Sequence, residues 1–208
     1  MSGYLKSYVA AAMEKDPAAT SKIMVLFTYP GVKALMWHRP ANWCYRHKMK
    51  FLARVISQHV RFWTGIEIHP GATIGKGVFI DHGAGVVIGE TAEVGNNVTL
   101  YQGVTLGGTG KDAGKRHPTI EDNVVIAAGA KVLGPFTVGK GSKIGAGSVV
   151  LKPVPENCTV VGVPGRIVKQ DGKRVDSLNQ VELPDPVLEE LRRINARLTP
   201  VSYTHLRA

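Results

Sequence analysis

A strict six-residue repeat of aliphatic side chains runs from residue 68 to residue 150 and constrains this chain more than any other feature. Helices repeat their buried positions about every 3.6 residues and half-buried strands every two, so neither explains a period of six. The repeat positions are Ile68, Ile74, Ile80, Val86, Ile88, Val94, Leu100, Leu106, Ile120, Ile126, Val132, Val138, Ile144 and Val150. Such hexads are typical of a three-sided coil whose aliphatic residues point inward. The sequence therefore predicts a mainly β fold, a parallel β-helix of between four and five coils.

The chain on either side of the repeat reads differently. Residues 1–65 are predicted to form an N-terminal helical region, residues 66–168 the β-helix, and residues 169–208 a tail with a short helix that starts at Asp185-Pro186. The net charge, counted as basic residues minus acidic residues, is 10 − 2 = +8 in the first segment, 9 − 8 = +1 in the second and 7 − 6 = +1 in the third. The overall charge of +10 therefore belongs to the helical third.

Two helical signals are clear in that third. Leu5, Val9 and Met13 recur at a spacing of four, and Asp16-Pro17 is typical of a helix N-cap followed by a first-turn proline. Residues 41–63 place apolar residues mostly at spacings of three and four, with Lys and Arg between them. They are predicted to form one amphipathic helix that docks on the core and turns its basic face to water.

Composition excludes several classes of protein. No apolar run reaches the roughly 18 residues of a membrane span, and the N-terminus is too polar for a signal peptide. Cys44 and Cys158 match no metal or redox spacing, which favours reduced thiols in a soluble, cytoplasmic protein. The basic helical face lacks the exposed aromatic platform of a nucleic-acid binder, so neither nucleic acid nor a membrane is an expected partner.

One long insertion interrupts the repeat. Leu106 and Ile120 are 14 residues apart instead of six, and the segment between them, 107–119, is rich in glycine and in basic residues. A loop of this composition that leaves a rigid wall is a candidate binding arm.

Several motifs resemble those of one family. They are Ile68-His69-Pro70-Gly71-Ala72, Phe79-Ile80-Asp81-His82-Gly83, Val87-Ile88-Gly89-Glu90-Thr91-Ala92, Val104-Thr105-Leu106-Gly107-Gly108-Thr109-Gly110-Lys111, Arg116-His117-Pro118 and Gly162-Val163-Pro164-Gly165-Arg166-Ile167-Val168. Together with Asp16-Pro17, they resemble the serine O-acetyltransferases of cysteine biosynthesis, which are hexapeptide-repeat acyltransferases. The resemblance covers roughly residues 3–168 and is closest to the short form of the family.

The resemblance implies the hand of the coil and an assembly. The β-helix would be left-handed, and three copies would associate as a homotrimer. About 65 residues precede the repeat, fewer than in relatives whose larger helical domain pairs trimers into hexamers, so a trimer is the expectation. Cysteine would be a feedback inhibitor at the serine site. Relatives that bind O-acetylserine sulfhydrylase end in isoleucine, whereas this chain ends Thr204-His205-Leu206-Arg207-Ala208, so that complex is not expected.

The resemblance also assigns the chemistry. Acetyl transfer to a hydroxyl requires a base, and a neutral imidazole suits that role. By resemblance the base is His82, and Glu67 is the acid that orients it, in a position where many relatives carry aspartate. By resemblance, Asp16 and Asp81 would bind the serine ammonium, and Arg116 with His117 its carboxylate. Pro17 belongs, with Asp16, to the substrate-binding Asp-Pro of the family. No metal and no permanently bound cofactor is expected.

The resemblance implies that acetyl-CoA binds as a co-substrate in the groove between two prisms. Backbone N–H groups near Gly108 would meet the oxyanion, because glycine allows close approach. The residues carried over for the coenzyme are Gly108, Thr109, Ala128, Lys143, Ala146 and Arg166.

Three alternatives stay open. The repeat is equally compatible with another hexapeptide-repeat O-acetyltransferase that acts on a different small acceptor. The second is a metal hydratase of the same fold, which holds a zinc ion between subunits with three histidines. His69, His82 and His117 supply the number but lack the close His-x4-His pair of such a site. The third alternative is a scaffold without catalytic activity.

Overall fold

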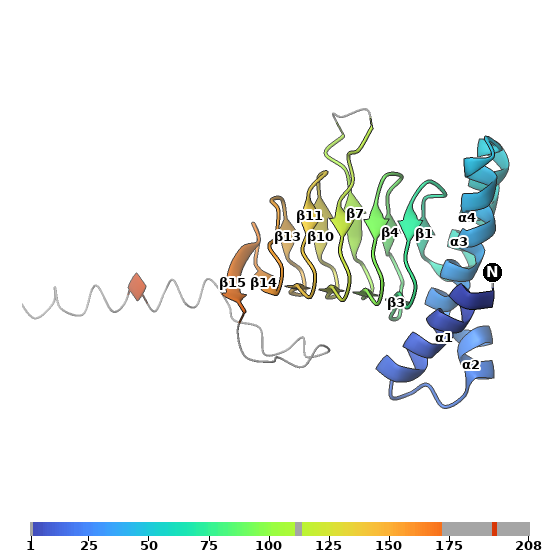
Figure 1. Cartoon of the computed structure of the whole chain (residues 1–208), viewed down its shortest axis with the longest axis horizontal. Helices are drawn as coiled ribbons and strands as arrows, with labels where there is room; N and C mark the ends of the chain where they lie inside the picture. The colour runs from blue at the N-terminus through green and yellow to red at the C-terminus, as the bar shows by residue number, and fades with distance from the viewer. Residues whose placement is uncertain (1, 111–113, 172–192, 195–208) are drawn as a thin grey trace, which may run out of the picture.

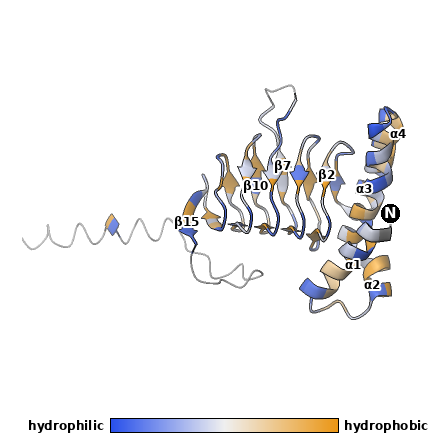
Figure 2. Ribbon diagram, viewed as in Figure 1, coloured by the Kyte–Doolittle hydropathy of each residue, from blue (hydrophilic) through white to orange (hydrophobic). Residues whose placement is uncertain are grey.

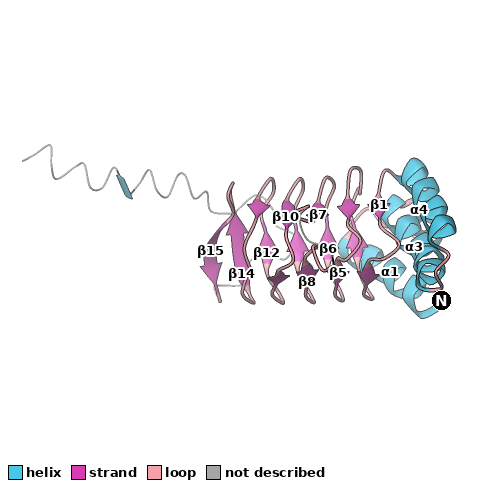
Figure 3. Cartoon of the chain, turned by 90° about the horizontal axis from the view of Figure 1, so that it is seen from above, coloured by secondary structure: helices cyan, strands magenta, loops and turns pink. Residues whose placement is uncertain are grey.

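The computed structural model describes residues 2–110, 114–171 and 193–194 of the chain. Four helices come first: α1 (Ser2–Lys15), α2 (Lys22–Thr28), α3 (Pro30–Arg46) and α4 (Lys50–Thr64). Fifteen short strands follow in these described ranges and stack in rows beside the helices (Figure 1; Figure 3). The helix predicted from Asp185 lies outside the described residues, except for Arg193 and Ile194.

The strands form three parallel faces. Face A holds β1 (Glu67–Ile68), β4 (Val87–Ile88), β7 (Thr105–Gly107), β10 (Lys131–Leu133) and β13 (Val149–Val150). Face B holds β2 (Thr73–Ile74), β5 (Glu93–Val94), β8 (Thr119–Ile120) and β11 (Thr137–Val138). Face C holds β3 (Phe79–Ile80), β6 (Thr99–Leu100), β9 (Val125–Ile126), β12 (Lys143–Ile144), β14 (Cys158–Val161) and the antiparallel β15 (Arg166–Gln170). The chain visits A, B and C in turn, which confirms the predicted parallel β-helix.

The repeat positions form the core of this prism. All fourteen are at most 5% exposed, and the hydropathy colours show apolar residues along the strands (Figure 2). Four coils are complete, and a fifth consists of β13, a bridge at Val154 and β14. The hexad count predicted between four and five coils because it ends at Val150 in β13, and the spacing beyond that position is irregular.

The two-residue slip in the repeat has a structural meaning that the periodicity did not reveal. Val86 is not a strand position: it precedes β4 as Ala72 precedes β2, and Ile88 is the strand residue. The slip adds two residues to the corner between faces C and A, so that residues 81–85 form a widened corner. His82 lies in it with a positive φ of 55° and a side chain that is 75% exposed.

Two predictions about the helices are wrong. Asp16-Pro17 does not start a helix: α1 ends at Lys15, and the Asp16 Oδ1 atom accepts a hydrogen bond from the backbone N–H of Ala18 within a turn. Ser21 is the N-cap of α2 instead. The cause is local, because an aspartate side chain closes such a turn as readily as it caps a helix.

The predicted continuous helix over 41–63 is also wrong, because the chain turns between α3 and α4. Lys48 has a φ of 64°, and the N–H of Met49 donates to the carbonyl of Cys44, a pattern typical of a helix C-terminus. The apolar spacing continues through this turn, so periodicity alone could not reveal the break.

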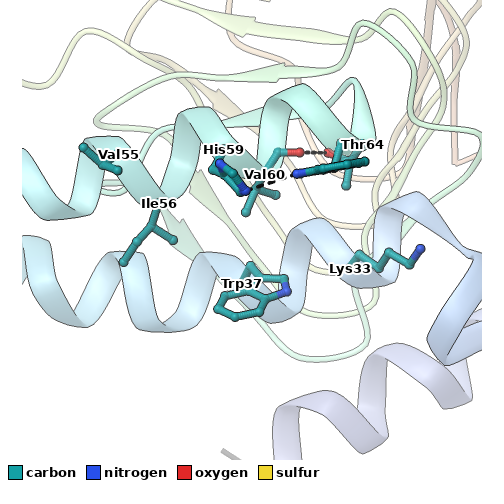
Figure 4. A pocket seen from close by; sticks show the side chains of 8 residues that line it. Lys33, Trp37, Val55, Ile56, His59, Val60 and Thr64 are labelled. Carbon is teal, nitrogen blue, oxygen red and sulfur yellow. Dashed lines mark hydrogen bonds between the residues drawn. The ribbon is translucent and has the colours of Figure 1, made fainter.

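Helix α4 turns much of its apolar surface outward. The residues that it buries are Ala53 and Ser57, whereas Phe51 is 84% and Phe62 79% exposed. A groove of about 520 Å³ runs between α3 and α4, with Trp37 on one wall and Val55 and Val60 on the other (Figure 4). The sequence predicted that this helical segment would expose its basic face, but α4 also exposes apolar side chains to solvent. None of the helices in the described part is both long and apolar enough to cross a bilayer.

The helices cover the first coil. Tyr8 of α1 and Leu35 of α3 belong to the same buried cluster as the prism core. A Cβ atom on Gly31 would collide with the backbone of Ile80, so the start of α3 lies directly on β3. Farther along α3, the His38 Nε2 atom lies 3.1 Å from the carbonyl oxygen of Ala72, and the Asn42 amide donates to the carbonyls of Pro70 and Ala72. Polar contacts thus fix α3 across the end of the prism.

The burial of His38 predicts a pH dependence of stability. Burial lowers the pKa of its imidazole to about 4. In the unfolded chain the group titrates near its ordinary value of about 6.5, so between these two values only the unfolded chain binds the proton. The free energy of unfolding should therefore fall as the pH drops from about 6.5 to about 4, by on the order of 3 kcal/mol from this residue. Urea denaturation of the wild type and of His38→Gln, compared across that range, measures the effect. The same pH dependence in both proteins would contradict it.

Candidate active site

The predicted site residues lie in two groups on different corners of the prism. The first, which we call the His82 cluster, consists of Asp16, Tyr29, Asp81 and His82 and lies at the corner between faces C and A. The second, the Arg116 cluster, consists of Tyr45, Glu90, Thr91, Arg116 and His117 and lies at the corner between faces A and B. Both occur where the six-residue repeat is interrupted.

The His82 cluster concentrates negative charge beside an exposed imidazole. The Tyr29 hydroxyl donates to the Asp16 Oδ2 atom at 2.6 Å, which raises the pKa of Tyr29 to about 12. Burial, together with the nearby charge of Asp16, raises the pKa of Asp81 above its usual range. The His82 Nε2 atom lies 3.9 Å from the Asp81 Oδ1 atom. The cluster can therefore attract a cation and place it next to a base.

Glu67 lies beside this cluster, but its contacts are with α4. The widened corner packs against the two residues that precede Glu67: the N–H of Gly85 donates to the carbonyl of Gly65, and a Cβ atom on Gly83 would collide with the Ile66 side chain. The Glu67 carboxylate is 3.2 Å from Arg61 and 3.8 Å from Arg54. Within the described ranges no hydrogen bond joins it to His82, so its role as the orienting acid stays a prediction.

The Arg116 cluster is built where the arm rejoins the prism. The Thr91 hydroxyl accepts hydrogen bonds from the backbone N–H groups of Arg116 and His117, at 3.0 and 3.1 Å. The N–H of Thr91 donates to the His117 Nδ1 atom at 3.2 Å, which makes Nδ1 an acceptor and leaves the proton on Nε2. Burial lowers the pKa of His117, which favours this neutral form.

The guanidinium of Arg116 is oriented by a carboxylate. Its NH2 atom donates to the Glu90 Oε2 atom, and the Tyr45 hydroxyl donates to the Glu90 Oε1 atom at 2.6 Å. The other guanidinium N–H groups, with the Nε2–H of His117, are donors of the kind that bind a carboxylate.

Sequence reasoning missed several residues of these two clusters. Tyr29, Tyr45, Glu90 and Thr91 received no role, and neither did Gly89, on which the His117 ring lies so closely that a Cβ atom would collide with it. Glu90 and Thr91 belong to the motif that follows Val87 and lie next to a corner of the prism, and this position could have indicated a role for them. The tyrosines are distant in sequence from their partners and leave no local pattern.

The residues predicted for acetyl-CoA follow both corners. Ala128 and Ala146 lie at the same corner of later coils as His82, whereas Gly108 and Thr109 lie at the base of the arm on the Arg116 side. Lys143 begins β12 on face C, and Arg166 begins the exposed edge of β15. A single prism does not bring these residues together.

Metal ligation has no support from the geometry of the described residues. In them, no group of three or more His, Cys, Asp or Glu side chains is arranged to hold a metal ion.

Comparison with known proteins identifies the class and then the family. The family described as bacterial transferase hexapeptide (six repeats) matches residues 117–152, which places the chain among the hexapeptide-repeat transferases. A serine acetyltransferase of Bacillus subtilis is 60% identical over 195 residues, covering 93% of this chain and 90% of the relative. One of Bacillus licheniformis is 61% identical over 191 residues, covering 91% and 88%. The chain belongs to the serine acetyltransferase family.

Solved structures agree with this assignment. A Neisseria gonorrhoeae serine acetyltransferase in complex with serine matches with a TM-score of 0.78 and 41% identity, over 81% of this chain and 69% of that one. A Brucella abortus serine acetyltransferase in complex with coenzyme A matches with a TM-score of 0.79 and 45% identity, over 82% and 68%. A serine acetyltransferase in complex with cysteine matches with a TM-score of 0.83 and 41% identity, over 86% and 70%. These matches confirm the predicted fold class, a left-handed parallel β-helix preceded by helices.

Proposed function

We propose that this chain is a serine O-acetyltransferase, which transfers acetyl from acetyl-CoA to the hydroxyl of L-serine and supplies cysteine biosynthesis. One observation carries the proposal: the chain presents a carboxylate-lined imidazole at one corner and a carboxylate-binding Arg-His pair at another. Serine carries the groups that these clusters complement. Its ammonium suits Asp16 and Asp81, its carboxylate suits Arg116 and His117, and its hydroxyl needs a base.

The reaction would be a direct transfer. His82 takes the hydroxyl proton as the serine oxygen attacks the thioester carbonyl, and N–H groups near Gly108 stabilise the oxyanion. The carbon–sulfur bond then breaks, and the imidazolium returns the proton to the leaving thiolate. Glu67 orients His82 by accepting a hydrogen bond from the second ring N–H of His82. The Glu67 carboxylate then has to bind His82 and Arg61 at the same time. Neither Cys44 nor Cys158 is a nucleophile in this scheme, because both are buried.

The same two clusters support a homotrimer. Face A separates them, and the four steps from Gly85 to Gly89 span roughly 13 Å when extended. The ammonium and carboxylate of serine are attached to one carbon, so one prism cannot offer both clusters to one serine. A triangular prism in a threefold assembly places the His82 corner of one protomer against the Arg116 corner of the next. Acetyl-CoA would lie in the groove between them, with the six predicted residues along its walls.

Two further parts of the proposal concern regulation and location. Cysteine shares the ammonium and carboxylate of serine, so it would compete at the same site, and a relative has been solved with cysteine bound. The two free, buried thiols fit a reducing compartment, which supports a cytoplasmic location.

An acceptor panel tests the function. Purified protein with acetyl-CoA should release thiol fastest with L-serine, and mass spectrometry should find O-acetylserine. L-threonine, L-homoserine and an amino sugar serve as matched acceptors that keep a hydroxyl and an amine. A faster reaction with any of them would contradict the proposal and favour the other hexapeptide-repeat acetyltransferases. Light scattering should give three times the 22.4 kDa mass of the chain, and a monomer would contradict the shared site.

A further inference from the structure

The Arg116 cluster contains one side chain that comes from the helices. Tyr45 lies in the last turns of α3, and its partner Glu90 follows β4, 45 residues later in the chain. Tyr45 is partly buried against the prism, where its ring meets that of His69 edge-on with the centroids 5.6 Å apart. The ring is therefore fixed on two sides, by its helix and by the first coil.

The hydroxyl of Tyr45 and the guanidinium of Arg116 share one carboxylate. Each oxygen of Glu90 accepts one of these donors: Oε1 takes the Tyr45 hydroxyl and Oε2 the Arg116 NH2 group. The two donors lower the pKa of Glu90, so it stays ionised, and the hydrogen bond raises the pKa of Tyr45, so it stays protonated. The pairing therefore persists at neutral pH.

Arg116 needs such support because of its place in the chain. It ends the arm that leaves the prism at residue 107, and its long side chain has several rotatable bonds. The Thr91 hydroxyl fixes the backbone of Arg116 but not its guanidinium. Glu90 fixes the guanidinium, and without Tyr45 the Glu90 carboxylate would itself lose one of its two partners.

We propose that Tyr45 is a positioning residue for serine: it holds Glu90, which holds the Arg116 guanidinium in the orientation that receives the substrate carboxylate. The inference rests on the proposed function and adds to it a determinant of acceptor selectivity. It makes recognition of the carboxylate depend on a residue of helix α3.

The test compares acceptors with and without a carboxylate. Tyr45→Phe removes the hydroxyl and keeps the ring, so the KM for L-serine should rise about tenfold, as expected when one hydrogen bond to a charged group is lost. The KM for L-serinamide, which lacks the carboxylate, should change less than twofold, as should kcat and the KM for acetyl-CoA. Glu90→Gln should give the same selective loss, and the double variant should add little to it, because both residues act through Arg116.

Tyr8→Phe is the matched control. Tyr8 is also a tyrosine of a covering helix, and its hydroxyl donates to the carbonyl of Gly75 at 3.2 Å, away from the Arg116 cluster. Tyr8→Phe should leave the ratio of the KM for L-serine to the KM for L-serinamide unchanged. If Tyr45→Phe raises both KM values equally, or neither, Tyr45 is merely structural and the inference is overturned while the function stands. A wild type that does not acetylate serine would overturn both.

Discussion

Replacing His82 by asparagine is expected to lower kcat for acetyl transfer to L-serine by about 10²–10⁴-fold, the range for loss of a general base. Asparagine is the most informative replacement because it tolerates the left-handed backbone conformation at this position. His82 has a φ of 55°, and Asn97, Asn123 and Asn157 occupy the same conformation at other corners, with φ values of 56°, 60° and 55°. Asparagine thus fits the corner but cannot take a proton, so the fold should survive while the chemistry does not.

A reciprocal variant controls for the geometry of the corner. Asn123 is exposed at a corner away from both clusters, so Asn123→His should keep full activity. Steady-state kinetics and thermal melting of both variants measure the outcome. A His82→Asn protein that melts like the wild type and retains more than a tenth of its kcat would show that the base lies elsewhere.

Mixed trimers of two impaired variants are expected to recover activity. Arg116→Gln removes the carboxylate partner and should raise the KM for serine about 30-fold or more, as when one member of a charge pair is truncated. If each site takes its His82 cluster from one protomer and its Arg116 cluster from the next, an Arg116→Gln chain beside a His82→Asn chain forms one intact site. In every threefold ring that contains both chains, about one site in three then combines two intact clusters.

The matched negative control uses two lesions in one cluster. Co-assembled His82→Asn and Asp81→Asn chains should recover nothing, because every site then carries a damaged His82 cluster. The experiment needs co-expression with two tags, isolation of trimers that carry both, and activity at subsaturating serine. Recovery in neither mixture would mean that both clusters serve one chain's own site.

The part of the fold that was predictable is the part that repeats. Inward aliphatic residues recur because each coil stacks on the last, so Ile68, Ile88 and Leu106 could be placed from spacing alone, and all are buried. The arm was found for the complementary reason: a segment that breaks a strict period must leave the wall. The spacing of two between Val86 and Ile88 also breaks the period, and it could have indicated that His82 lies in a widened corner.

The parts that escaped prediction depend on contacts between distant residues or on a local choice between two conformations. Tyr45 meets Glu90, and Tyr29 meets Asp16 across a turn, so neither pairing has a sequence signature. Asp16-Pro17 fits both a helix start and a turn, because the aspartate side chain can accept the local N–H in either conformation. The break at Lys48 is hidden because a basic residue there gives no sign of a left-handed backbone.

The way α3 lies across the first coil changes what the boundary at residue 65 means. A solenoid ends with a repeat that has no neighbour, and the exposed end must be sealed by a cap. Here Leu35 closes the apolar end of the first coil, while His38 and Asn42 bind the carbonyls that a preceding coil would otherwise cover. Residue 65 therefore separates two sequence patterns but not two folding units. An engineered prism that starts at residue 66 would need a substitute cap before any question about its catalysis could be asked.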